Sequence, residues 1–145
     1  MVVVDTNILV YAADRDSPQH DACRSWLEEQ RQQTGAWYST WSIAYEFLRV
    51  TTHPLVMRKP WRVNEAWGFV EALLGSPGFA MLAPTPRHAS VAKDVLAHQP
   101  GLSGNLLHDA HTAILMREHG IRRICTHDMD FHRFTFLEVL DPLRP

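Results

Sequence analysis

Four acidic residues stand at positions from which they could act together, although they are far apart in the chain. They are Asp5, Glu46, Asp109 and Asp128. Carboxylates held close together raise one another's pKa values, and a divalent cation is the simplest way to neutralise them. Their hard oxygen atoms favour Mg²⁺ or Mn²⁺ over softer metals. Such a cation activates water and offsets charge on a phosphoryl oxygen, so the four acids predict metal-assisted hydrolysis of a phosphate ester.

The elements expected around these acids should bring them to one edge of a sheet. Asp5 directly follows an apolar strand, and Asp128 comes two residues after another, Ile124-Cys125-Thr126. Asp109 lies near the first turn of one expected helix, and Glu46 in the second turn of another. In an open parallel sheet, ligands bind beyond the carboxyl ends of the strands, which is also the edge where the following helices begin. We therefore expect the four side chains to converge there.

Two of the acids are expected on the apolar stripes of their helices. Glu46 comes three residues after Ile43, and Asp109 comes three residues after Leu106. Residues at this spacing share a helix face. A carboxylate on the core-facing side is costly unless a partner neutralises it, which again favours a bound cation.

Each acid also has a purely structural interpretation. Asp5 could be the N-cap of the next helix, and Asp109 could complement a helix dipole. Asp128 could be a turn residue, and Glu46 could pair with Arg49 three residues later. These structural roles do not explain why all four acids are expected at the same edge of the sheet.

A second ligand set is available from histidines. His108 and His111 are three residues apart on one expected helix, and His127 adjoins Asp128. These three histidines would suit a zinc-dependent hydrolase, but the HExxH motif is absent and nine histidines make chance neighbours common. Asp130 is a further acidic candidate, either as an outer ligand or as the cap of the turn before Phe131.

Short apolar segments alternate with helical patterns, which favours an α/β fold with a central, mainly parallel sheet. Right-handed crossovers place helices on both faces, giving three α/β/α layers. We expect four to five strands and helices between them, all in one domain over residues 1–145. The strands are expected over 2–4, 36–39, 79–83, 122–126 and 136–140. The helices are expected over 6–13, 17–33 with Ser17-Pro18 at its start, 39 or 40 to 52, 63–74, 85–98 and 105–120.

The composition is that of a globular protein rather than a disordered chain or a membrane protein. The chain has 145 residues, of which 46% are hydrophobic and 21% charged, and its net charge is −2. This balance excludes a globally basic nucleic-acid binder, but not a local basic strip. Cys23 and Cys125 form no metal-binding spacing, and the opening residues do not resemble a secretory signal. We expect free thiols and a cytoplasmic protein.

The basic strip with the highest charge density is Arg58-Lys59-Pro60-Trp61-Arg62. Trp61 could stack on an RNA base while its neighbours bind phosphates, although an ordinary solvated loop explains the strip as well. Arg15 and Arg133 follow the acidic segments closely and are further candidates for phosphate contacts. The five tryptophans of the chain exceed the apparent needs of the core.

The segments around the four acids resemble the motifs of PIN-domain ribonucleases, specifically the VapC toxins of toxin–antitoxin pairs. The resemblance covers almost the whole chain, in the order and spacing of that family. The four segments are VVVDTNILVYA from residue 2, Ile43–Leu48, Asn105–Ala110 with the helix up to Gly120, and Thr126–Phe131.

The resemblance implies roles for individual residues. Asp5 and Asp109 would be the principal metal ligands, while Glu46 and Asp128 would complete the metal shells or orient the attacking water. Thr6 and Asn7 would hold the first carboxylate by hydrogen bonds.

The resemblance also implies an activity and partners. The expected protein has the PIN fold and is a Mg²⁺-dependent endoribonuclease that cuts RNA, for example a tRNA or another structured RNA. It would form a homodimer and bind a VapB-like antitoxin, whose arginine would pair with the acidic pocket. Two alternatives stay open, namely a module on the same scaffold that binds RNA or protein without cleaving, and a housekeeping nuclease without an antitoxin.

Overall fold

The computed structural model of the chain describes residues 1–144 and contains one sheet of five strands. All neighbouring strands are parallel, in the order β3-β2-β1-β4-β5. The prediction of a central parallel sheet is therefore confirmed. The strands are β1 (Val2–Val4), β2 (Trp37–Thr40), β3 (Phe79–Leu82), β4 (Arg123–Cys125) and β5 (Glu138–Leu140).

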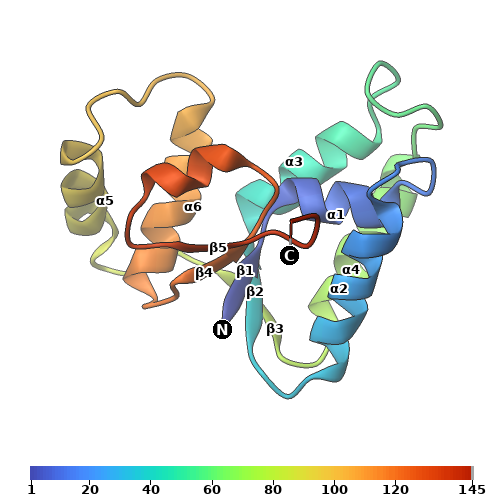
Figure 1. The fold of residues 1–145 in the computed structure, drawn as a ribbon, viewed down its shortest axis with the longest axis horizontal. Helices are drawn as coiled ribbons and strands as arrows, with labels where there is room; N and C mark the ends of the chain where they lie inside the picture. Colours follow the sequence, from blue (N-terminus) through green and yellow to red (C-terminus); the bar gives the residue numbers. More distant parts are fainter. Residues whose placement is uncertain (145) are drawn as a thin grey trace.

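Helices cover both faces of this sheet and complete the predicted α/β/α layers (Figure 1). Helices α5 and α6 lie on one side, and α1 to α4 lie on the other. The crossovers place the beginning of each following helix at the edge where the strands end. The helices are α1 (Thr6–Ala13), α2 (His20–Gln32), α3 (Trp41–Thr51), α4 (Val63–Leu74), α5 (His88–Ala97) and α6 (Leu106–Glu118).

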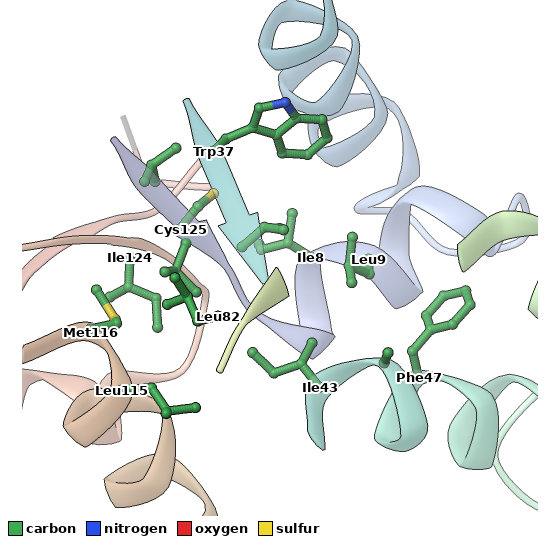
Figure 2. Packing of buried hydrophobic residues seen from close by; sticks show 14 of the residues in the cluster. Ile8, Leu9, Trp37, Ile43, Phe47, Leu82, Leu115, Met116, Ile124 and Cys125 are labelled. Carbon is green, nitrogen blue, oxygen red and sulfur yellow. The ribbon is translucent and has the colours of Figure 1, made fainter. Parts of the chain in front are cut away.

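The core lies on both faces of the short central strands. The three valines of β1 are buried, as expected for a central strand covered by helices on both faces. Figure 2 shows Leu115 and Met116 on one side of the strands and Ile8 and Leu9 on the other. This packing fixes β1 and β4, after which the predicted site residues Asp5 and Asp128 follow.

Two local features differ from the predicted elements. Helix α2 begins at His20 rather than at Ser17-Pro18, because the Ser17 hydroxyl accepts a hydrogen bond from the Gln19 N–H at 3.2 Å and closes a separate turn. A short 3₁₀ helix (Met129–Arg133), which the sequence analysis did not predict, follows β4. This 3₁₀ helix shapes the segment that carries Asp128 and Asp130.

The cysteines and the helix lengths bear on the predicted class of protein. Cys23 and Cys125 are buried free thiols, as predicted. Within residues 1–144, none of the helices combines the length and the apolar character needed to cross a lipid bilayer.

Candidate active site

The structure brings the four predicted acids together in one cleft at the carboxyl edge of the sheet. The cleft has a volume of about 780 Å³ and lies among β1, α3, α6 and the segment after β4. The four acids, which come from separate parts of the sequence, therefore share one solvent-filled space. The lining residues are Asp5, Ser42, Ile43, Tyr45, Glu46, Arg49, Asn105, Leu106, His108, Asp109, Thr112, Asp128 and Asp130.

Asp5 is the most buried of the four acids, with 8% of its surface exposed. One carboxylate oxygen accepts the Thr6 N–H at 2.8 Å, so Asp5 does cap α1. The other oxygen accepts the Asn7 side-chain amide at 3.1 Å and the Thr126 hydroxyl at 2.7 Å. Asp5 therefore caps α1 and also lines the cleft, because its carboxylate lies at the edge of the site while it accepts the Thr6 N–H.

Thr126 is a site residue to which the sequence analysis assigned no role. Its buried hydroxyl donates to Asp5 and accepts hydrogen bonds from the Asn7 amide at 3.1 Å and the Asp128 N–H at 3.0 Å. The Asn7 side-chain oxygen also accepts the His127 N–H at 3.1 Å. Thr126 therefore ties the segment after β1 to the segment after β4. In the sequence, the only indication of this role is that Thr126 ends an expected buried strand two residues before Asp128.

Thr6 holds the Asp5 carboxylate as the resemblance implies, through its backbone, and it also contacts a second acid. Its backbone N–H binds Asp5, but its hydroxyl donates to Glu46 at 3.0 Å. Thr6 thereby connects α1 to α3.

The expectation that Glu46 lies on the core-facing stripe of its helix is wrong. The buried face of α3 carries Ile43 and Phe47, and Glu46 lies about 100° away from Phe47 around the helix axis. Glu46 faces the cleft and is about half exposed, and its carboxylate is 3.9 Å from the Arg49 guanidinium. The pairing with Arg49 that the sequence allowed is therefore present alongside the contact with Thr6.

Asp109, Asp128 and Asp130 form the tightest group of possible metal ligands. One carboxylate oxygen from each lies within 4.8 Å of the others, and no other such trio of acids, histidines or cysteines occurs in residues 1–144. Asp128 also accepts the Asp130 N–H at 2.9 Å and caps the 3₁₀ helix. That cap is what brings Asp130, the further acidic candidate, beside the two predicted acids.

The cleft holds its carboxyl groups in an unfavourable electrostatic environment. Burial, together with the charges of Asp128 and Asp5, raises the pKa of Asp109 to about 7. Burial also raises the pKa of Asp5 to about 6, with Glu46 and Asp128 adding to the effect and hydrogen bonds from Thr126 and Thr6 opposing it. An added positive charge would relieve this repulsion, so the site suits a cation.

Comparison with known proteins identifies the family to which this chain belongs. The PIN domain model matches residues 2–137. The chain is 34% identical over 142 residues to Ribonuclease VapC48 of Mycobacterium tuberculosis, covering 95% of this chain and 94% of that protein. The chain belongs to the VapC ribonucleases of the PIN-domain family. Ribonuclease VapC33 of the same organism is 30% identical over 144 residues, with 99% of each chain covered.

Solved structures agree on the fold. VapC20 of Mycobacterium tuberculosis, described as a toxin that cleaves the sarcin–ricin loop, matches with a TM-score of 0.68 at 17% identity, covering 96% of this chain and 98% of that chain. VapBC2 from Rickettsia felis, bound to a DNA fragment from its promoter, matches with a TM-score of 0.67 at 15% identity. That match covers 97% of this chain and 98% of the other. At these identities the likeness shows the PIN fold alone.

The three histidines proposed as a zinc set are not brought together in this PIN domain. The His127 ring nitrogen Nδ1 is 2.7 Å from the Asp141 carboxylate, and the ring packs edge-on against Tyr11. His111 contacts the Ser42 hydroxyl at 3.3 Å, and His108 lines the cleft. Within residues 1–144 the grouped ligands are the three aspartates described above, so the zinc alternative gains no support.

The predicted basic strip at residues 58–62 does not line the acidic cleft. Trp61 is half-buried, and its ring packs against Phe47 at 6.3 Å and Phe69 at 6.1 Å between centroids. These contacts make Trp61 part of the packing between α3 and α4.

The arginines predicted to contact phosphates lie elsewhere as well. Arg15 lines a smaller pocket of about 240 Å³ beside α1, α2 and α4, and Arg133 is absent from the described lining of the cleft. Among the described lining residues of the cleft, Arg49 is the only arginine.

Proposed function

We propose that this chain is a metal-dependent endoribonuclease that holds Mg²⁺ or Mn²⁺ with Asp5, Glu46, Asp109 and Asp128 and hydrolyses RNA phosphodiester bonds. The observation that carries the proposal is the convergence of these four acids in one cleft. A protein with no use for that cleft would gain stability by replacing its crowded carboxylates.

The donor set fits a hard divalent cation. Oxygen ligands from several carboxylates suit Mg²⁺ or Mn²⁺, and the close oxygens of Asp109, Asp128 and Asp130 support a site at that position. Asp5 and Asp109 would be the principal ligands, with Asp130 as an additional outer one. When bound, such a cation supplies a more acidic water and offsets charge on the phosphoryl oxygens.

Hydrogen-bonding groups next to the cleft hold these acids in place. The Asn7 amide and the Thr126 hydroxyl restrain one oxygen of Asp5, while the Thr6 N–H restrains the other. Glu46, steadied by the Thr6 hydroxyl, would orient the attacking water or complete the ligand shell. Asp128 would act in the same way.

We propose further that the chain is a single-domain toxin that acts in the cytoplasm, forms a homodimer and is restrained by a VapB-like antitoxin. The VapC relatives and the matching VapBC2 complex support this assignment. An arginine of the antitoxin would block the cleft by pairing with its carboxylates and competing with the cation. The RNA target would be a structured RNA, for example a tRNA.

Sequencing of RNA ends after a brief pulse of expression tests the activity and identifies the target. Wild-type protein should create new ends at defined sites, and Asp5→Asn should create none while keeping the fold. If Asp5→Asn cuts as wild type does, its role as a ligand is wrong. If purified wild type shifts RNA but leaves it intact with Mn²⁺, the protein is a binding module instead.

A further inference from the structure

Two aromatic side chains are exposed beside the acidic cleft. Trp41 is 42% exposed and Tyr45 is 63% exposed, and within residues 1–144 every other Phe, Trp and Tyr side chain is more buried than these two. They are four residues apart on α3, with ring centroids 6.5 Å apart. Tyr45 lines the same cleft as the four acids. Large rings left in water at the entrance of a site point to a ligand that covers them.

The packing of the fold does not require this arrangement. Ile43 and Phe47 supply the buried face of α3, so Trp41 and Tyr45 stand on its outer side. Trp41 stacks on Trp67 of α4, with centroids 6.3 Å apart and ring planes 15° apart. The contact with Trp67 supports the Trp41 ring from one side, whereas Tyr45 projects at the cleft with most of its surface in solvent.

A cationic side chain continues the same row. Arg49 follows Tyr45 by one helical turn, is 65% exposed and also lines the cleft. Its guanidinium lies 3.9 Å from the Glu46 carboxylate, which is longer than a hydrogen bond. The guanidinium therefore keeps donors free for a phosphate group.

We propose that Trp41, Tyr45 and Arg49 form a nucleotide-binding row that determines which RNA the cleft accepts, an inference that rests on the proposed ribonuclease function. Tyr45, backed by Trp41, stacks on the base next to the scissile phosphate, and Arg49 binds a neighbouring phosphate. Stacking of this kind requires a base that is splayed out of a helix. The substrate class is therefore RNA with unpaired nucleotides at the cut site, rather than continuous duplex.

Binding to matched oligoribonucleotides tests the row directly. The probe is a fluorescein-labelled, unstructured oligoribonucleotide, compared by anisotropy with a copy in which abasic residues replace the bases. All variants carry Asp5→Asn so that the probe stays intact, and Mg²⁺ is present throughout. Leu96→Ala serves as the matched control, since Leu96 is 40% exposed on α5 and does not line the cleft.

The stacking role predicts a selective loss. Tyr45→Ala should weaken binding of the base-bearing probe about 5- to 150-fold, the loss expected on removing one base–aromatic stack worth about 1–3 kcal/mol. It should leave the abasic probe unaffected, and Tyr45→Phe should bind as the parent does. Arg49→Gln should weaken both probes and lower the salt dependence of binding by about one phosphate contact.

Three results would overturn the proposal. Tyr45→Ala could bind the base-bearing probe as the parent does, or it could weaken both probes equally. Alternatively, Tyr45→Ala could change the sedimentation of the RNA-free protein, which would make this face a contact between two copies of the chain. Failure of the ribonuclease function itself is recognised separately, because a pulse of wild-type expression would then create no new RNA ends in the sequencing experiment described above.

Discussion

Ionisation of the buried Asp5 carboxylate should lower the free energy of unfolding, and this loss can be measured. Burial raises its pKa from 3.8 to about 6, with Glu46 and Asp128 contributing. Because the pKa is higher in the folded state, the folded protein binds more protons than the unfolded chain between about pH 4 and pH 6. Stability of the metal-free protein is therefore lost as the pH rises through that window. Each pKa unit corresponds to about 1.4 kcal/mol, so the full cost is about 3 kcal/mol at neutral pH and above.

Asp5→Asn removes this cost while almost preserving the shape of the side chain. Like a protonated aspartate, asparagine presents an acceptor at one position and a donor at the other. We expect stability to be nearly unchanged at about pH 4 and to rise by up to about 3 kcal/mol at about pH 8.

Urea unfolding in EDTA, followed by circular dichroism across this pH range, gives the stability difference. Asp16→Asn is the control, because Asp16 is exposed and lies outside the cleft. The reasoning is refuted if Asp5→Asn gains no stability over wild type between the two pH values. Saturating Mg²⁺ should then stabilise wild type by about 3 kcal/mol at a hundred times its dissociation constant, and Asp5→Asn by much less.

Three further changes test other parts of the structure. Thr126→Val should destabilise the protein by about 1–3 kcal/mol in urea unfolding and slow RNA cleavage, because Asp5 loses its 2.7 Å donor. The pKa of Asp109, raised to about 7, predicts that Mg²⁺ affinity measured by calorimetry increases up to about pH 7, a dependence that Asp109→Asn should flatten. Glu118 is buried, which alone would raise its pKa, but hydrogen bonds from Thr85 lower it. Glu118→Gln should therefore reduce the free energy of unfolding by about 1.5–3 kcal/mol at pH 7, measured by thermal unfolding. This loss should become smaller as the pH falls below 4.5.

The main elements could be predicted because local pattern and parallel topology determine them. The valines of β1 form a β-branched run because the strand is buried on both faces, and the residue after it must lie at the carboxyl edge. Asp5 and Asp128 were placed at one edge by that argument alone. Their convergence required only the order of strands and helices.

The details of the cleft depend on contacts that a linear pattern does not contain. The bond from Thr126 to Asp5 joins residues 121 positions apart and exists only because β4 pairs with β1 in the observed register. The side of α3 that carries Glu46 is decided by a rotation of about 100° per residue, so spacing from Ile43 alone misplaced it.

The tryptophans illustrate the same limit of sequence patterns. Trp61 lies in a basic segment, yet its ring packs against Phe47 of α3 and Phe69 of α4. Trp41 sits in a segment with no such charge and is exposed near the cleft. Which aromatic ring is left for a ligand follows from helix packing rather than from neighbours in the chain.

Anomalous X-ray diffraction from crystals soaked in Mn²⁺ tests most directly whether these acids hold a cation. We expect an anomalous peak coordinated by Asp5 and Asp109, with Asp128 or Glu46 close to it, and no peak there in crystals of Asp109→Asn. A Mn²⁺-saturated wild-type crystal with no peak in the cleft, or with its metal held by the histidines instead, would contradict the account.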